Sequence, residues 1–268
     1  MNPLQRALIE KAGHDYGFEH VLVSGLEGVV LASARHAARA QVSALPAGGY
    51  VLRLLQVATP ALLPEMHRSF ATVLHSDGFA AGSVAELAAL FRRASGLARA
   101  LPSQVAQDYE AAVSSELAKL PGGLGGTEVE RVVRQRVGQQ KFRAAMLDYW
   151  GGACAVTGVA LPEVLRASHA KPWAACVSDA ERLDVFNGFL LVANLDALFD
   201  RFLISFDDDG QLLVSPRLSA DDQGCLGLSP GMALRWLSDT HRRYLAWHRG
   251  QTTGGNSLSG QQQPAREL

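Results

Sequence analysis

Apolar and polar residues follow a helical period over much of the first half of the chain, with a strand-like pattern in between. Helices are predicted at residues 3–13, 60–74, 84–100 and 103–119, where apolar residues recur three or four positions apart. Short strands are predicted between the first two helices, in β-rich runs at residues 20–24, 27–33 and 49–57. Residues 1–120 are therefore expected to form an N-terminal α+β domain.

Two changes in composition divide the chain. Residues 121–127 read PGGLGGT, and such a concentration of glycine with one proline is typical of a linker. Residues 251–268 are polar and carry no periodic apolar face, so we expect them to form a disordered tail. A C-terminal domain is thus predicted between these two segments, at residues 128–250.

The C-terminal domain is predicted to begin with a helix over residues 128–143. Thr127 and Glu130 fit a capping box at its start, and a break or kink is expected near Gly138. Residues 154–158, CAVTG, then predict a short strand and a turn. The domain is therefore expected to open with a helix that leads into short strands.

The next elements are predicted in the order strand, loop, strand and helix. The strands are expected at residues 164–170 and 189–193, and the helix at residues 194–202. The first strand ends at His169, because the proline that follows it cannot continue a ladder. The loop ends at the turn pair Asn187-Gly188, and Asn194 is expected to cap the helix.

The composition sets limits on cofactors and location. Cys154, Cys176 and Cys225 are far apart and form no close pair, which argues against a disulfide framework and against a cysteine-built zinc site. The N-terminus lacks an apolar core of the signal-peptide kind, and no apolar run approaches the length of a membrane span. We therefore expect a cytoplasmic protein without membrane contact.

A nucleic-acid partner would have to be held by local patches, because the net charge is −1. Residues 128–143 hold five basic residues and two glutamates, a net charge of +3. One interpretation is phosphate contact, and the other is an ordinary solvated helix face. The candidates for phosphate contact are Arg131, Arg134, Lys141, Arg143, Arg166 and Lys171.

The predicted helix at residues 194–202 carries candidate metal ligands. Asp196 and Asp200 are four positions apart, so both carboxylates lie on one helical face and repel each other. A divalent cation would offset that repulsion, and oxygen ligands suit Mg²⁺ or Mn²⁺. The alternative is two solvated aspartates near a helix start, which the helix dipole favours. A histidine can take a proton from water near neutral pH, so His169 is a candidate base.

These segments resemble a known family. The words CAVTG, ASHAKPW and DVFNGFLLVANLDALFDRFLISFDDDG are similar to the HNH endonucleases, in their bacterial restriction-like branch, and the resemblance runs from about residue 135 to about residue 249. It implies a ββα-metal fold, which agrees with the predicted order of elements. The expected fold class is α+β, with an N-terminal α+β domain followed by an HNH nuclease domain.

The resemblance also implies roles for individual residues. His169 matches the general base, and Asn187 matches the central asparagine, which ties the loop together and helps orient the base. Asp196 and Asp200 match metal ligands, and Asn194 is an alternative ligand. Ser168 stands where many relatives have an aspartate or histidine ligand. The cofactor implied is Mg²⁺, with Mn²⁺ as the second candidate.

The function expected is metal-dependent cleavage of DNA, in a restriction or defence role. Relatives of this type join a nuclease to a module that reads DNA, sometimes modified DNA, and residues 1–120 would be that module by analogy. A homodimer is expected if one HNH centre per copy is to cut both strands. Two other classes stay open: an HNH-fold DNA-binding or regulatory protein that has lost catalysis, and a hydrolase of another phosphodiester.

Overall fold

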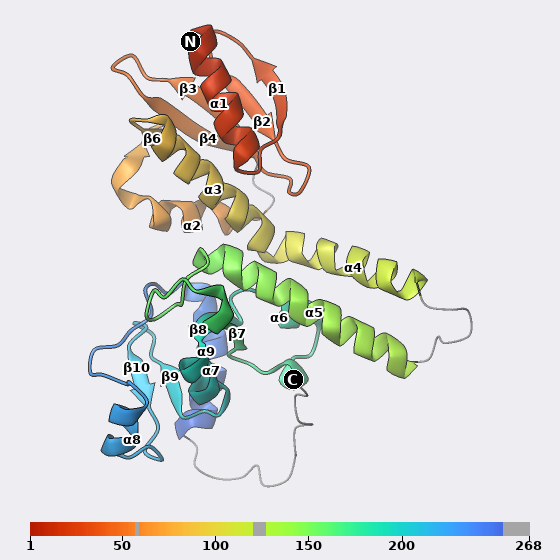
Figure 1. Cartoon of the computed structure of the whole chain (residues 1–268), viewed down its shortest axis with the longest axis vertical. Coiled ribbons are helices and arrows are strands. Elements are labelled where there is room, and N and C mark those ends of the chain that lie inside the picture. The colour runs from red at the N-terminus through yellow and green to blue at the C-terminus, as the bar shows by residue number, and fades with distance from the viewer. Residues whose placement is uncertain (57–58, 120–126, 254–268) are drawn as a thin grey trace.

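The structure is a computed structural model that describes residues 1–56, 59–119 and 127–253. Figure 1 shows a sheet with helices at one end of an elongated molecule and a smaller group of strands and helices at the other end. Two long helices, α4 and α5, run side by side between them (Figure 1). The described residues combine helices with antiparallel sheets, which confirms the predicted α+β class.

The N-terminal part is built on one antiparallel sheet, with the order β1-β2-β3-β4-β6-β5 among the described residues. Its strands are β1 (His20–Ser24), β2 (Val29–Ala32), β3 (Arg39–Ala44), β4 (Tyr50–Gln56), β5 (Leu74–His75) and β6 (Gly78–Ala81). Its helices are α1 (Pro3–Asp15), α2 (Leu62–Ser69), α3 (Val84–Ala100) and α4 (Pro102–Ala118). α1 and α3 pack together on one face of the sheet (Figure 1).

Alternation along the strands separates a buried face of this sheet from an open one. Val42 and Leu52 are cross-strand partners and are fully buried against the helices. The neighbouring pair, Gln41 and Arg53, points to the opposite side. Two adjoining hollows of about 290 and 480 Å³ share Gln41 as a lining residue. We call this side the open face, and it includes Val23, Val30, Gln41, Ser43 and Arg53.

The N-terminal prediction was correct for α1, α3 and α4 but missed β3, β5 and β6. Residues 60–74 do not form one helix, because α2 ends at Ser69 and Phe70 has a non-helical φ of −133°. A 3₁₀ turn, η1 (Ala71–Val73), then leads into β5. Leu74 pairs with Phe79, and Phe79 also pairs with Leu52, so strand pairing overrides the helical pattern here.

α5 (Thr127–Trp150) is one continuous helix, so the break expected near Gly138 is wrong. Gly138 serves packing instead: a Cβ at this position would overlap the six-membered ring of Trp173. Glycine in a helix usually weakens it, and here the missing side chain makes room for an aromatic ring from a distant loop. A pattern of residues along one helix does not contain that information.

The C-terminal part confirms the predicted order of strand, loop, strand and helix. It contains η2 (Pro162–Val164), β7 (Leu165–His169), η3 (Trp173–Ala175), α6 (Asp179–Leu183), β8 (Gly188–Val192), α7 (Ala193–Asp200), β9 (Ile204–Phe206), β10 (Leu212–Val214), α8 (Ala220–Cys225) and α9 (Asp239–Thr253). The strand expected at residues 154–158 is wrong, because this segment is a turn in which Gly158 N–H donates to the Cys154 carbonyl. Asn194 is not the cap of α7, since the helix begins one residue earlier and follows Val192.

The two ends of the molecule meet where α3 packs on α5. Arg99 makes a two-pronged ion pair with Asp148, with both N–O distances at 2.9 Å. Arg93 donates to the carbonyl oxygens of Asp148 and Tyr149. Burial lowers the pKa of the Arg93 guanidinium to about 10, which leaves it charged at neutral pH. These contacts fix the N-terminal half of the chain onto the helix that supports the C-terminal strands.

Some predictions fall outside the described residues. The predicted linker lies there except for Thr127, and so does the predicted tail from residue 254 onward, whereas residues 251–253 belong to α9. Over the described residues, none of the helices combines the length and the hydropathy needed to cross a membrane.

Candidate active site

The candidate site is built on the antiparallel pair β7–β8 and the helix α7 that follows it. Ser168 pairs with Phe189 and His169 pairs with Gly188, so the end of β7 meets the start of β8. A side chain at Gly188 would collide with the Ser168 carbonyl oxygen, which explains why the turn pair needs glycine there. The chain between the strands, residues 170–187, is called the clamp loop below.

His169 is held by contacts on three sides. Its Nε2 lies 2.8 Å from the carbonyl oxygen of Arg182 in the clamp loop. Its ring stacks on Phe142 of α5 at a centroid distance of 3.7 Å, and the Trp173 ring meets it edge-on at 6.0 Å. Because a carbonyl oxygen only accepts, Nε2 carries the hydrogen, and in the neutral imidazole Nδ1 keeps the lone pair. This tautomer suits a base that takes a proton at Nδ1.

Asn187 is fully buried and ties the clamp loop together. Its Oδ1 accepts from the Lys171 N–H at 2.8 Å, and its Nδ2 donates to the carbonyl oxygens of Lys171 and Glu181, both at 3.1 Å. Nδ2 also lies 3.4 Å from the Cys176 sulfur. The side chain has its hydrogen-bonding groups engaged inside the protein, so Asn187 acts on the loop rather than on a substrate.

Ser168 and Asp196 lie in contact between β7 and α7. The buried Ser168 hydroxyl donates to Asp196 Oδ1 at 2.5 Å. Asp196 is in the first turn of α7 and Asp200 is its last, exposed residue. Asn194 lies apart from this group in its bonding, since its Nδ2 donates to the Leu226 carbonyl at 3.2 Å. The structure therefore joins Ser168 to Asp196 and directs Asn194 toward the chain that follows α8.

The oxygen donors at this site suit a magnesium ion. Over the described residues no three or more His, Cys, Asp and Glu side chains form a metal-binding group. Mg²⁺ needs no such cage, because one or two carboxylates hold it while waters and substrate phosphates complete its shell. Asp196 and Asp200 are carboxylates of this kind on one helix, so they fit Mg²⁺. They do not fit a structural zinc site, and burial raises the pKa of the Cys176 thiol, which disfavours the thiolate.

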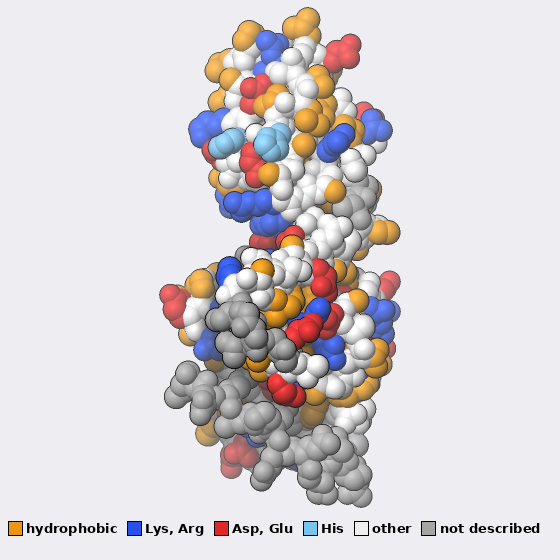
Figure 2. All heavy atoms as spheres, turned by 90° about the vertical axis from the view of Figure 1, so that its right-hand side faces the viewer, with side chains coloured by type: hydrophobic (Ala, Val, Ile, Leu, Met, Phe, Trp, Pro, Cys, Tyr) orange, Lys and Arg blue, Asp and Glu red, His pale blue; other side chains and the backbone are white. Residues whose placement is uncertain are grey.

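Several predicted phosphate ligands are engaged within the chain. Arg131 pairs with Glu128, Arg134 with Glu130, and Lys171 with Glu181, at 2.7, 2.9 and 2.7 Å. The last contact lowers the pKa of the Glu181 carboxyl below its ordinary value. On the face drawn in Figure 2, acidic and basic side chains are correspondingly interspersed over the lower half. The two pairs within residues 128–143 are already counted in the net charge of +3, and Arg136 of the same segment pairs with a carboxylate outside it, Glu116.

Of the other three basic residues, Arg166 lies in β7, Arg143 contacts its first residue, and Lys141 lies on α5. Arg143 donates to the carbonyl oxygens of Leu165 and Pro162, at 2.8 and 3.2 Å. Arg166 donates to the carbonyls of Glu163 and Leu165, both at 2.9 Å, and Lys141 is half-buried beside Phe142 on α5. A carbonyl contact leaves the positive charge of an arginine uncompensated, so these residues keep a net charge near the site.

Sequence patterns did not identify three partners of His169. Phe142 belongs to a predicted helix, and its ring stack requires α5 to pass under β7. The Arg182 carbonyl is a backbone group, which carries no residue-type signal. Trp173 lies in the clamp loop, and its contact with Gly138 depends on two segments that are distant in the sequence. The sequence KPW at residues 171–173 and the pair Asn187-Gly188 predict the two ends of the loop, but they do not predict these contacts.

Two other histidines in this part are structural. His248 stacks on Phe199 at 3.8 Å and bonds to Ser205 Oγ and the Phe199 carbonyl, each at 3.0 Å. Burial lowers the pKa of His248 to about 4 and that of His241 to about 3. Both are neutral and enclosed at ordinary pH, whereas His169 is only half-buried.

The strand–loop–strand–helix unit with a held histidine at the end of its first strand is the architecture of an HNH nuclease centre. Residues 154–207 match the family described as HNH endonuclease. This segment spans the turn at Cys154, β7, the clamp loop, β8, α7 and β9. The match supports a nuclease function for the chain and DNA as its substrate. No curated protein matches the chain.

Proposed function

We propose that this protein is a DNA endonuclease that depends on a divalent metal ion, with His169 as its general base. The observation that carries the proposal is the position of the imidazole between the Phe142 ring and the Arg182 carbonyl oxygen. These contacts favour one orientation and one tautomer before a substrate arrives. Preorganisation of this kind is what a general base needs in order to work at neutral pH.

The reaction is hydrolysis of a phosphodiester. Nδ1 of His169 takes a proton from water while the water oxygen forms a bond to phosphorus, and the bond between phosphorus and the 3′ oxygen breaks. The products are a 5′ phosphate and a 3′ hydroxyl, the latter protonated from solvent. Asp196 and Asp200 would hold the metal, and Ser168 orients the Asp196 carboxylate. When bound, Mg²⁺ or Mn²⁺ supplies positive charge that stabilises the leaving oxygen.

The DNA backbone is assigned to the basic residues near β7. Lys141, Arg143 and Arg166 keep uncompensated charge there, which supports contact with phosphates. Arg131, Arg134 and Lys171 have carboxylate partners, so their charges contribute less to this attraction. We therefore expect the first three to matter more for DNA affinity than the second three.

Target selection is assigned to residues 1–120, in a restriction or defence role, with modified DNA as a substrate to be tested. The open face supports this assignment because its larger hollow, about 480 Å³, is lined by polar side chains that include Gln41, Ser43, Arg53, His75 and Asp77. His75 Nδ1 accepts from the Asp77 N–H at 3.1 Å, so Nε2 is a donor. Donors and acceptors together are suited to reading base edges.

A second function deserves a test because of Ser168. A hydroxyl stands where many relatives supply a charged or imidazole ligand, and no group of three metal-binding side chains was found over the described residues. A protein that binds DNA through the HNH fold without cutting it fits these two observations. The two functions differ in a single outcome, the appearance of a broken phosphodiester.

Supercoiled plasmid incubated with the protein and Mg²⁺ or Mn²⁺ separates them. The nuclease predicts nicked or linear plasmid, no cleavage in the presence of EDTA, and products with 5′ phosphates. Retarded but intact plasmid under both metals supports the binding protein. Parallel reactions on matched modified and unmodified plasmid test target selection, and equal rates on both would reject dependence on modification.

A further inference from the structure

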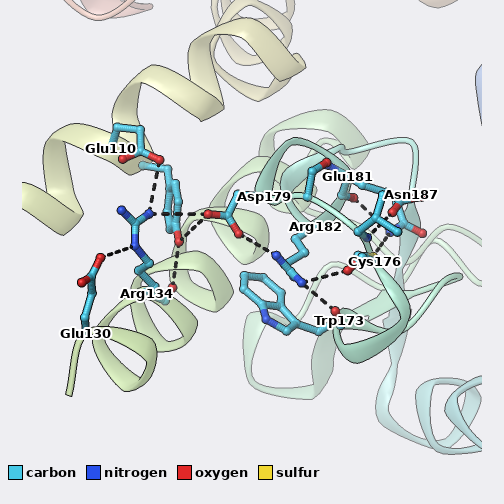
Figure 3. A network of polar contacts seen from close by, with 12 residues as sticks. Glu110, Glu130, Arg134, Trp173, Cys176, Asp179, Glu181, Arg182 and Asn187 are labelled. Carbon is cyan, nitrogen blue, oxygen red and sulfur yellow. Dashed lines mark hydrogen bonds and ion pairs between the residues drawn. The ribbon is translucent and has the colours of Figure 1, made fainter. Parts of the chain in front are cut away.

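The guanidinium of Arg182 joins three parts of the clamp loop. Nε donates to the Trp173 carbonyl at 3.2 Å, Nη2 to the Cys176 carbonyl at 2.8 Å, and Nη1 to Asp179 Oδ1 at 2.9 Å. Figure 3 shows the guanidinium between these groups, beside the Trp173 ring, whose centroid is 5.6 Å away. One planar side chain therefore sets the distance between the start of the loop and α6.

The backbone of the same residue holds His169. The Arg182 carbonyl accepts from His169 Nε2, and this carbonyl belongs to α6, which has only five residues. So short a helix does not keep its place by its own backbone bonds, because one turn is marginal without tertiary contacts. The position of the carbonyl therefore depends on the side chains that anchor α6, and Arg182 supplies two hydrogen bonds from α6 to the carbonyls of Trp173 and Cys176.

Asp179 connects this arrangement to the N-terminal half of the chain. Its Oδ1 receives Arg182, while its Oδ2 lies 3.5 Å from Arg134 Nη1 and 3.4 Å from the Tyr109 hydroxyl. Arg134 also pairs with Glu110, so α4, α5 and α6 meet at one polar cluster (Figure 3). Burial raises the pKa of the Tyr109 hydroxyl, which stays protonated and can donate to Asp179.

We propose that Arg182 is a positioning residue for His169: its guanidinium fixes the clamp loop so that its own carbonyl oxygen keeps the imidazole as the Nε2–H tautomer. The proposal rests on the assignment of His169 as the base. It assigns Arg182 no contact with DNA, because its N–H groups point into the loop. Asp179 is the anchor through which α4 and α5 support the arrangement.

A purely structural role for Arg182 predicts a different effect on activity. Removing an arginine whose guanidinium makes several hydrogen bonds lowers the stability of the fold at any position. If its role were only structural, activity would fall only because fewer molecules are folded. Arg249 offers a matched control in the same half of the chain. Its side chain is 23% exposed against 24% for Arg182, and it also bridges a backbone carbonyl and an aspartate, Phe206 and Asp208.

The test compares Arg182→Ala, Arg182→Lys and Arg249→Ala in the full-length protein. Cleavage of a labelled duplex is measured at saturating Mg²⁺. The folded fraction of each variant is taken from its thermal unfolding curve, and kcat is expressed per folded molecule. We expect Arg182→Ala to lower kcat tenfold or more with KM for DNA changed less than twofold, and Arg249→Ala to leave kcat per folded molecule unchanged. Arg182→Lys keeps the positive charge and the aliphatic part of the side chain but loses the planar set of guanidinium donors. We therefore expect its kcat to be less than half of the wild-type value.

A second readout does not depend on cleavage. In protein labelled with ¹⁵N-histidine, the His169 signals, assigned by their loss in His169→Ala, report which ring nitrogen carries hydrogen above pH 8. We expect Nε2–H in the wild type and in Arg249→Ala, and a mixture of tautomers in Arg182→Ala. If Arg182→Ala folds poorly, Arg182→Lys is expected to show the same mixture.

The outcomes separate this proposal from the function on which it rests. A wild-type protein that never cleaves DNA but keeps the Nε2–H tautomer only with Arg182 overturns the proposed function and supports the positioning role. Conversely, cleavage that needs His169 but is unchanged in Arg182→Ala, with an unchanged tautomer, overturns the positioning role alone. Equal losses of kcat per folded molecule in Arg182→Ala and Arg249→Ala also overturn it.

Discussion

Two of the antiparallel sheets among the described residues, the N-terminal sheet and the β7–β8 pair, differ in what covers their side chains. In the N-terminal sheet, helices cover one face, while Gln41 and Arg53 lie on an open face above a hollow of about 480 Å³. In the β7–β8 pair, the residues from Gly188 to Leu191 are all buried, and the clamp loop is fastened to α5. The first sheet leaves side chains available for a partner, whereas the second fixes one histidine in place.

Under the proposed function, this difference separates recognition from chemistry. A base must be held within a fraction of an ångström, so the contacts around His169 come from buried rings and backbone groups. A reading surface must adapt to its partner, and on the open face Arg53 is exposed while Gln41 and Ser43 are half-buried. Substitutions in the two regions should therefore differ in kind, and the predictions below run from the largest expected effect to the smallest.

Asp196→Asn should have the largest effect on the reaction among these. It removes the negative charge that would attract a divalent ion but keeps an oxygen to accept from Ser168. We expect the cleavage rate to fall by about a hundredfold or more at saturating DNA, which corresponds to roughly 3 kcal/mol of transition-state stabilisation. Ser168→Ala is the companion variant, and an Asp196→Asn protein as fast as the wild type would remove Asp196 from the metal site.

Asn187→Ala should destabilise the clamp loop by about 3 kcal/mol, because three buried backbone groups lose their partners at once. Urea unfolding followed by fluorescence measures the change. Asn194→Ala is the matched control, since that asparagine is exposed and its Nδ2 donates to the Leu226 carbonyl at 3.2 Å. A difference below about 1 kcal/mol between the two variants would contradict a clamped loop.

His248 should make the stability of the C-terminal part fall in acid. Its folded-state pKa is about 4, below the ordinary value of 6.5, so the unfolded chain binds the proton more readily. The stabilising contribution is complete above pH 6.5 and is lost as the pH falls toward 4, by about 1.4 kcal/mol per pH unit at most. Unfolding free energies at pH 7, 6 and 5 should therefore decline less steeply in His248→Gln than in the wild type.

Arg53→Ala should have the smallest effect and should act on binding alone. The side chain is exposed on the open face, so we expect a change in stability within about 0.5 kcal/mol. DNA affinity at moderate salt should fall about threefold to tenfold, in line with the loss of one favourable contact. Fluorescence anisotropy with a labelled duplex measures it, and unchanged affinity in Arg53→Ala and Gln41→Ala would remove the open face from target selection.

The sequence was informative where short patterns decide structure. The alternation of β-rich and helical residues predicted β7, β8 and α7, and the order His169, Asn187, Asp196 indicated a nuclease centre before any contact was visible. Prediction from sequence failed where contacts between distant segments determine the local structure. β3 reads RAQVSA, whose small residues give a weak strand signal until the neighbouring strands bury Ala40 and Val42. Gly138 was interpreted as a helix breaker because nothing near it announces Trp173.

The most direct test of the account is the rate of DNA cleavage by the wild type and by His169→Ala under the same Mg²⁺ concentration. Single-turnover reactions with excess protein separate the bond-breaking step from DNA binding and product release. The account predicts metal-dependent cleavage by the wild type and a loss of at least about a hundredfold in His169→Ala, with DNA affinity unchanged. Cleavage at the wild-type rate in His169→Ala would contradict the account, whatever the metal.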